Sequence, residues 1–310
     1  MSSRHPQDSR LPASPLHRAL RDGRAPRGPK LRAPRHVEPT PGARSLARLS
    51  PNLQTEARAR VVVSIISHGH RDAVLPLLRD LARHARHSVA RVVLTLNVAE
   101  PGLEAAAAAA CAGVPLTIRR NARPLGFGAN HNAAFAQAQQ QLGPAAHFAV
   151  INPDVRLRAD PFPALCAALA RDARAGCAYP DQLDSSGRPC NPPRPVPTPA
   201  NLLRRYLAGG ELAQRADWVN AAFALFRAST YRALGGFDPG YRLYCEDVDL
   251  CLRLQLGGWN LTRAACAVQH AGSRASRVSA RHLYWHVRSL LRLWASDALR
   301  RYMGSVLIRR

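Results

Sequence analysis

The chain has 310 residues, 46% of them hydrophobic, which is enough to bury the core of one large domain or two small ones. Its formal net charge of +24 comes almost entirely from arginine, since Lys30 is the only lysine, and predicts affinity for nucleotide phosphate, phospholipid, anionic glycolipid or nucleic acid. The seven scattered cysteines form no C-x-x-C pair, which argues against a disulfide framework or a zinc site.

Residues 1–58 are rich in Pro, Arg, Ser and His and lack hydrophobic periodicity, which predicts a disordered basic arm. The arm is either an extension without a role, a misassigned start, or an electrostatic tether to an anionic surface. No apolar run approaches the roughly 18 residues of a transmembrane helix, and the basic N-terminus lacks the apolar core of a secretory signal. We therefore expect a cytoplasmic protein.

Residues 61–66 form a β-branched apolar run typical of a buried strand, and 91–96 form a second one. Between them Val74, Leu77, Leu78 and Leu81 recur at helical spacing. This βαβ unit predicts a ligand site beyond the carboxyl ends of its strands, where Ser67 and Asn97 fall. His68 and His70 follow the first strand, and for each a structural role is favoured over a catalytic one.

Residues 104–113 read as an alanine-rich helix and 116–118 as a short strand. A Gly-rich turn over 121–132 then leads into a helix over 133–141. That turn is either an ordinary loop or a helix N-terminus that binds an anion with help from Arg123.

The next strand, 147–155, ends in Asn152-Pro153-Asp154, which in isolation is typical of an Asx turn. A helix over 162–173 precedes a hairpin and a Pro-rich loop. The strand predicted over 217–227 carries Trp218, for which a core aromatic is favoured over a side chain that stacks on a ligand.

An acidic segment follows the turn Gly235-Gly236-Phe237-Asp238-Pro239 and begins a helix that Gly257-Gly258 ends. Glu246, Asp247 and Asp249 lie in its first turn. They either complement the helix dipole or form an acid/base or cation site. A strand over 261–268 leads to His270. The tail, 280–310, is a helix that packs on the domain or lies on a membrane with Trp285, Trp294 and Tyr302 at headgroup depth.

The segment GGFDPGYRLYCEDVDLCLRLQLGGW resembles the acceptor-side motif of inverting family-two glycosyltransferases, especially the bacterial rhamnosyltransferase-like branch. The resemblance extends over most of 61–295: Gly126, Phe127 and Asn130 match the family's N-x-G-F-x-x-x-N stretch, and Asn152-Pro153-Asp154 matches its D-x-D-type element. It implies a GT-A-like α/β domain over 59–275, with a central, mostly parallel mixed sheet flanked by helices. The basic arm precedes this domain, and an amphipathic basic helix over 276–310 follows it.

The same resemblance implies the site. Asp247 would be the catalytic base, with Glu246 beside it, and Asp249 would cap the helix. Asp154 and His270 would hold Mg²⁺ or Mn²⁺. Donor-binding residues would be Ser67, Asn97, Gly126, Asn130, Asn152, Asp154, Asp181 and Arg194; acceptor-binding residues would be Trp218, Asn220 and Tyr244. Leu96 stands where the family usually has Asp, and His68-Gly69-His70 replaces its usual aromatic-Asn pair.

The implied reaction moves a sugar from a nucleotide-diphosphate donor, with dTDP-rhamnose suggested by the branch, to a hydroxyl of a glycan or lipid-linked glycan. Such an enzyme would serve bacterial cell-wall or polysaccharide synthesis, in the cytoplasm or peripherally on the cytoplasmic face of an anionic inner membrane. One alternative is a nucleic-acid-binding protein, which is disfavoured because the arginines are dispersed and no recognition motif appears. Another is a catalytically impaired family member that only binds nucleotide-sugar.

Overall fold

The computed structural model describes residues 61–142, 145–207, 217–270 and 280–308. The chain divides into two compact units, 1–48 and 49–310, and everything described lies in the second. The predicted basic arm therefore lies outside the described residues. None of the helices described combines the length and apolarity needed to cross a bilayer.

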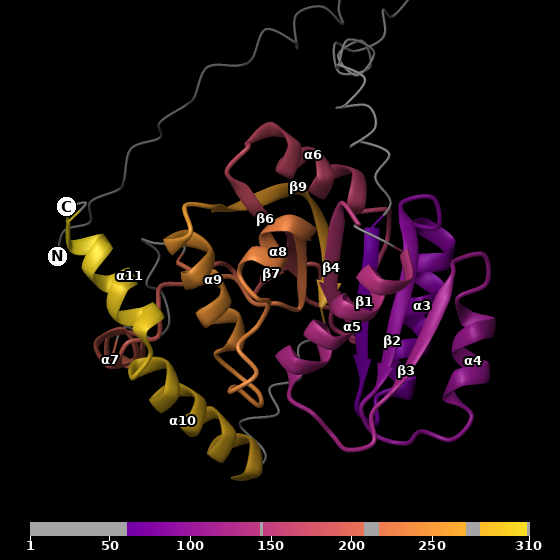
Figure 1. Ribbon diagram of the computed structural model, residues 1–310, viewed down its shortest axis with the longest axis horizontal. Helices are drawn as coiled ribbons and strands as arrows, with labels where there is room; N and C mark the ends of the chain where they lie inside the picture. Colours follow the sequence, from indigo (N-terminus) through magenta and orange to yellow (C-terminus); the bar gives the residue numbers. More distant parts are fainter. Residues whose placement is uncertain (1–60, 143–144, 208–216, 271–279, 309–310) are drawn as a thin grey trace, which may run out of the picture. The chain divides into compact units, whose positions relative to one another are not determined.

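One nine-stranded sheet runs through the described ranges in the order β3-β2-β1-β4-β8-β6-β9-β5, with β7 paired to β6 (Figure 1). The first four strands in this order are parallel neighbours, whereas β8 runs antiparallel to both β4 and β6, and β9 runs parallel to β6. The expected mixed sheet is thereby confirmed. The strands are β1 (Val61–Ser67), β2 (Val89–Leu96), β3 (Leu116–Arg120), β4 (His147–Ile151), β5 (Val155–Arg156), β6 (Ala175–Leu183), β7 (Pro189–Cys190), β8 (Phe223–Arg227) and β9 (Asn260–His270).

Helices cover both faces of the sheet, as the uniformly buried β1 requires. Val61, Val63 and Ile65 of β1 pack in one core cluster with α3, α4 and α6. Val62, on the opposite face, packs with α5, α8 and α9 in a second cluster. The helices are α3 (Arg71–His84), α4 (Leu103–Ala110), α5 (Phe127–Leu142), α6 (Phe162–Arg171), α7 (Pro199–Leu207), α8 (Ala228–Ala233), α9 (Glu246–Leu256), α10 (Ala280–Trp294) and α11 (Asp297–Ile308).

Helix α5 begins at Phe127, six residues before the start predicted from the sequence. A Cβ on Gly128 would lie 2.4 Å from the Cβ of Phe237, so this glycine allows the helix to approach the Gly235–Pro239 turn closely. Asn132 then fixes that turn: its Nδ2 donates to the Phe237 carbonyl at 2.7 Å, and its Oδ1 accepts from the Phe237 N–H at 3.0 Å. The glycine that looked like a loop signal is a packing residue.

The predicted single helix over 276–310 is two helices, α10 and α11, which is a correction to the sequence reading. Ser296 lies at the break, where its Oγ donates to the Leu293 carbonyl and accepts from the Leu299 N–H. Leu293, Leu299 and Tyr302 are buried in a third cluster with α9. The C-terminal helices therefore pack on α9, which agrees with the prediction that this tail packs on the domain.

Other predicted boundaries also differ from the structure, among them that of the strand predicted over 147–155, which ends at Ile151. The strand predicted over 217–227 is regular only from Phe223, because the residues before it form a bridge and a turn. Helix α4 ends at Ala110 and α6 at Arg171, earlier than predicted.

Candidate active site

Three predicted donor-side residues, Ser67, Asn97 and Asn152, lie at the carboxyl ends of neighbouring parallel strands. Ser67 ends β1 and pairs with Leu96, which Asn97 follows, while Ile65 pairs with Ile151 at the end of β4, just before Asn152. Parallel strands end at one edge of a sheet, so these residues lie along a common edge, where α/β proteins bind ligands. The structure brings this part of the predicted site together.

The amides of Asn97, Asn121 and Asn130 form a network that holds the loop before α5. Asn97 Oδ1 accepts from the Leu125 N–H and from Asn121 Nδ2, both at 2.8 Å, and Asn121 Nδ2 also donates to Asn130 Oδ1 at 2.6 Å. A Cβ on Gly126 would lie 2.8 Å from the Arg242 carbonyl oxygen. These residues shape the loop, and their contact with a nucleotide remains a prediction.

Asp154 and His270 meet although they are far apart in the sequence. The register of β5 and β9 pairs Val155 with His270, which places Asp154 beside the imidazole. The Asp154 Oδ2 to His270 Nε2 distance is 3.3 Å. Burial raises the pKa of Asp154, but the hydrogen bond and charge of His270 outweigh that effect and leave the pKa below its ordinary value.

The contacts of the second ring nitrogen of His270, Nδ1, determine what this pair can bind. Nδ1 lies 2.9 Å from Gln182 Oε1, which can only accept, and 3.2 Å from Asn191 Nδ2. The closer contact suits a proton on Nδ1, and in that tautomer the Nε2 lone pair faces the Asp154 carboxylate. Two electron-rich atoms at this distance require a second imidazole proton or a cation between them.

The residues present therefore fit a divalent cation with two protein ligands. In the described part of the chain no cluster of three or more His, Cys, Asp or Glu side chains has the geometry of a metal site. A cation at Asp154 and His270 would take its remaining ligands from water and from bound phosphate oxygens, as Mg²⁺ does with phosphate substrates.

The acidic turn is held in an unusual backbone conformation. Tyr244 and Cys245 have φ values of 73° and 63°, so two consecutive non-glycine residues adopt left-handed geometry immediately before α9. Glu246, 5% exposed, then lies in the first turn with its Oε2 unpartnered among the described residues. Burial and the neighbouring charge of Asp247 raise the pKa of Glu246 well above its ordinary value, which favours a neutral carboxyl group.

Asp247 is half-buried, and its carboxylate accepts a hydrogen bond from the Val248 N–H at 2.9 Å. Burial raises its pKa, and backbone hydrogen bonds from Val248 and Ala221 and the charge of Arg194 oppose the rise. The pKa of Asp247 is raised by burial, and the charge of the Arg194 guanidinium acts on the same carboxylate. This combination suits a general base that works near neutral pH.

Backbone and side-chain contacts connect Asp247 to the Asp154–His270 pair. The Asn152 N–H donates to the Ala222 carbonyl at 2.8 Å. The preceding residue, Ala221, donates its backbone N–H to the Asp247 carboxylate. On the other side Arg194 donates to Asn191 Oδ1 at 3.0 Å, and Asn191 contacts His270. The strand-end aspartate, the imidazole and the carboxylate pair thus belong to one connected group of residues.

Gln182 and Asn191 belong to this group but were not singled out from the sequence. Gln182 Nε2 donates to Asn220 Oδ1 at 2.5 Å, so the predicted acceptor residue Asn220 also joins it. Both missed residues lie near the β6–β7 hairpin, where polar residues look like ordinary turn chemistry. Only the pairing of β6 with β9 reveals that they face His270.

Asp181 points away from this group, which corrects its predicted role as a donor contact. Successive residues of a strand face opposite sides of the sheet, and its neighbour Gln182 faces His270. The Asp181 carboxylate instead makes a two-point ion pair with Arg263, at 2.7 and 2.5 Å.

Asp249 does not cap α9, contrary to the prediction. It is buried and pairs with Arg253 one turn later, at 2.7 Å. Arg253 also donates to the carbonyls of Leu234 and Gly236. The ion pair therefore fastens α9 to the Gly235–Pro239 turn and has a structural role.

The remaining predicted acceptor residues are held by other elements. Trp218 Nε1 donates to the Pro195 carbonyl, and the Arg194 guanidinium lies 5.6 Å from its ring centroid. The Tyr244 hydroxyl lies 2.9 Å from His282 Nδ1 on α10. Trp218 fits the favoured reading of a packing residue, while Tyr244 links the acidic turn to the C-terminal helices.

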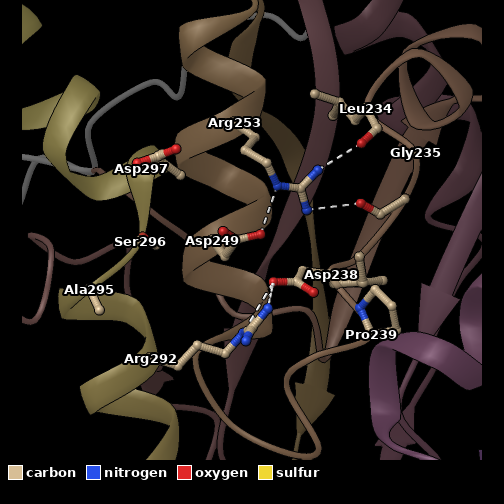
Figure 2. A pocket seen from close by; sticks show the side chains of 13 residues that line it. Leu234, Gly235, Asp238, Pro239, Asp249, Arg253, Arg292, Ala295, Ser296 and Asp297 are labelled. Carbon is tan, nitrogen blue, oxygen red and sulfur yellow. Dashed lines mark hydrogen bonds and ion pairs between the residues drawn. The ribbon is translucent and has the colours of Figure 1, made fainter.

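A separate hollow of about 780 Å³ lies between the Gly235–Pro239 turn, α9 and the α10–α11 junction. Figure 2 shows Arg253 reaching Asp249 and the turn carbonyls, with Arg292 reaching Asp238. None of the predicted site residues lines this hollow. The hollow is therefore distinct from the Asp154–Asp247 group.

Comparisons with known proteins agree with this fold. No protein-family model matches the chain. A mannosyltransferase from Pyrobaculum calidifontis, solved in complex with GDP-Man and Mn²⁺, superposes with a TM-score of 0.53 at 19% identity, over 76% of this chain and 65% of that one. The fold is therefore that of the GT-A glycosyltransferases.

Sequence similarity indicates which glycosyltransferases the chain resembles. The chain is 27% identical over 252 residues to rhamnosyltransferase WbbL of Escherichia coli K12, covering 76% of this chain and 92% of that protein. It is 28% identical over 190 residues to an N-acetylglucosaminyl-diphospho-decaprenol L-rhamnosyltransferase of Mycobacterium tuberculosis, covering 53% and 62%. The resemblance is confirmed: the chain is rhamnosyltransferase-like in sequence and GT-A in fold, which supports a nucleotide-sugar glycosyltransferase.

Proposed function

We propose that this protein is an inverting glycosyltransferase that moves one sugar, rhamnose in this proposal, from a nucleotide diphosphate to a hydroxyl of a glycan or lipid-linked glycan. The observation that carries the proposal is the connection of Asp247 to the Asp154–His270 pair through the Ala221–Ala222 backbone. A base for the acceptor and an anchor for the diphosphate then lie on the two sides of one reacting centre.

In the proposed reaction Asp247 accepts the proton of the acceptor hydroxyl as that oxygen attacks the anomeric carbon. The new bond joins the acceptor oxygen to the anomeric carbon, while the bond to the phosphate oxygen breaks and its electron pair leaves with the nucleoside diphosphate. Attack from the face opposite the leaving group inverts the anomeric configuration. Glu246, kept neutral by burial, can donate a hydrogen bond beside the base.

Asp154 and His270 are the residues that would hold Mg²⁺ or Mn²⁺. When bound, the cation would supply positive charge that stabilises the departing diphosphate. Gln182 and Asn191 orient the imidazole so that Nε2 faces the ligand. Supporting this, the solved mannosyltransferase of the same fold carries Mn²⁺ with its nucleotide-sugar.

We also propose that the protein works at the cytoplasmic face of an anionic membrane, using the exposed side of α10. Arg281 and Arg288 are exposed there, as are Leu283 and Val287. Trp294 and Tyr302 are excluded from this role, which corrects the sequence reading. Trp294 donates to the Pro197 carbonyl, and Tyr302 is buried with its hydroxyl donating to Asp217.

Thermal unfolding with a panel of nucleotide-sugars, with and without Mn²⁺, tests donor binding. A ligand that binds only the native state raises the melting temperature, and at a hundredfold excess over Kd it adds about 2.7 kcal/mol. We expect dTDP-rhamnose with Mn²⁺ to give the largest rise. An Asp154→Asn, His270→Gln double variant should lose the Mn²⁺-dependent part and keep the rest. If it kept the full metal-dependent rise, the assignment of the metal ligands would be wrong.

A further inference from the structure

Helix α10 presents two opposite faces. The outer face consists of apolar side chains that are between 48% and 60% exposed: Leu283, Tyr284, Val287 and Leu291. They fall within about 100° around the helix axis, because successive residues are about 100° apart. The inner face, centred about 180° away, contacts the loop 238–245 that leads into α9. Its residues are His282, Trp285, His286, Ser289 and Arg292.

The inner face holds the end of this loop by direct contacts. Ser289 is buried, and its Oγ donates to the Leu243 carbonyl at 2.8 Å. The Tyr244 hydroxyl lies 2.9 Å from His282 Nδ1, and the ring centroids of Tyr244 and His286 are 4.9 Å apart. One helix therefore contacts both the backbone and a side chain of the loop.

The loop needs this support because its backbone is strained. Tyr244 and Cys245 have φ values of 73° and 63°, a geometry that non-glycine residues keep only where surrounding contacts hold it. Asp247 follows two residues after Cys245, so the direction of its carboxylate depends on this strained pair. The contacts from Ser289 and His282 thus help to position the proposed base.

The first half of α10 is held by little else. Among the described residues of α10 the buried side chains are Ser289 and Leu293, both in its second half. A segment with few buried apolar contacts opens more readily than the core, and a helix as short as 280–287 is marginal on its own. A partner that stabilises the helical state of 280–287 therefore also stabilises the loop that this helix holds.

An anionic membrane is the partner that fits the outer face. Its apolar side chains adjoin Arg288, which is exposed one turn after Tyr284. An apolar strip beside arginines is typical of a helix that lies in the headgroup region of anionic lipid. A second copy of this chain fits less well, since each copy carries a formal net charge of +24. The apolar side chains meet the lipid together only while the segment is helical, so the membrane favours the state that holds the loop.

We propose that an anionic membrane, bound to the outer face of α10, holds the loop before α9 in the conformation that aims Asp247 at the acceptor. The inference rests on the proposed function and names how its site is regulated. Ser289 and His282 are positioning residues in this account, because they reach Asp247 only through the loop.

Amide hydrogen exchange of residues 243–249, with and without phosphatidylglycerol vesicles, tests this coupling. Exchange should slow by about tenfold in the wild type when vesicles bind, while the amides of β1 should not change. Ser289→Ala, His282→Phe removes both inner-face hydrogen bonds, so this variant should bind vesicles and gain no protection. The matched control Ser305→Ala loses a similar hydroxyl-to-carbonyl bond, to Tyr302 within α11, and should be protected like the wild type.

Substitutions on the outer face test the partner. Leu283→Ser, Val287→Ser should lose the vesicle-dependent protection, even where another part of the chain tethers the protein to the vesicle. Phosphatidylcholine vesicles should protect less than phosphatidylglycerol vesicles, because they lack net negative charge. Protection that rises with protein concentration in the absence of lipid would assign the outer face to a second copy and overturn the membrane proposal.

Two further results would overturn the coupling. One is a wild type that binds phosphatidylglycerol vesicles without slower exchange of 243–249. The other is equal protection in Ser289→Ala, His282→Phe, which would mean that the membrane acts on the loop by another route.

Asp247→Asn separates this inference from the proposed function. It should abolish sugar transfer and keep the vesicle-dependent protection. Protection without transfer by the wild type would refute the proposed reaction alone. Transfer without protection would refute this inference alone.

Discussion

Asp247 and Asp249 lie two residues apart in α9 but have opposite surroundings, because a helix turns about 200° over two residues. Asp247 faces the Ala221 N–H and the charge of Arg194, whereas Asp249 faces Arg253 and the Gly235–Pro239 turn. We therefore propose different roles for these identical side chains: Asp247 acts as the base, and Asp249 is the buried partner in an ion pair that holds α9 to the turn.

The matched variants Asp247→Asn and Asp249→Asn test this division. The first should lower the transfer rate by about a thousandfold, as expected for loss of a general base, with little change in the free energy of unfolding. The second should cost about 2 kcal/mol of stability, because it removes the buried carboxylate that accepts a charge-assisted hydrogen bond from Arg253. Steady-state transfer assays and urea unfolding measure the two effects. If Asp249→Asn had the larger effect on rate and Asp247→Asn on stability, the assignment would be reversed.

Glu246 predicts a dependence of stability on pH. Burial raises its pKa in the folded protein, so unfolding releases a proton at pH values between the ordinary glutamate pKa and the raised one. This contribution is present at acidic pH and is lost as pH rises through the folded pKa. Glu246→Gln removes it, so the variant should gain in melting temperature over the wild type as pH increases. A difference that stayed constant from acidic to alkaline pH would contradict the raised pKa.

At the scale of elements, the contact between α5 and the Gly235–Pro239 turn positions the acidic helix. Gly128 lets α5 approach Phe237, and Asn132 bonds both backbone groups of that residue. The turn is also held from the other side by Arg253 of α9. Two helices thus fix the approach to the acidic turn.

Two glycine variants distinguish a packing glycine from one without contacts. Gly128→Ala would place its new carbon 2.4 Å from the Phe237 Cβ, and should cost about 2 kcal/mol through overpacking. Gly304→Ala in α11 meets nothing within 4 Å and should stabilise the protein by up to about 1 kcal/mol. Chemical unfolding of both variants checks the signs, and equal changes would show that α5 tolerates a wider spacing.

Elements whose cause is local were predictable from the sequence. The apolar run of β1 and the glycine-terminated α9 carry their own signals, and both lie close to where the sequence predicts them. The break at Ser296 was missed because the apolar spacing continues through it, and the real signal is one hydroxyl bonding two backbone groups. The sequence also could not predict which side of the sheet Asp181 and Gln182 face, since that depends on the register of β6 against β9.

At the scale of the whole described unit, the sheet explains why distant residues share a site. Its parallel half ends at the loops that follow β1, β2 and β4, and its mixed half brings His270 next to Asp154 through the β5–β9 pairing. Figure 1 shows α9 and the C-terminal helices on the mixed half. The resemblance to a known family implied roles for these residues, whereas the contact between Asp154 and His270 follows only from the strand order.

The central claim is that this group of residues transfers a sugar with inversion, using Asp247 as base. The most direct measurement is NMR of the product formed from dTDP-rhamnose and a lipid-linked glycan, comparing its anomeric configuration with that of the donor. The account predicts the opposite configuration in the product, and no product from Asp247→Asn. Retained configuration, or transfer that survives the Asp247→Asn change, would contradict it.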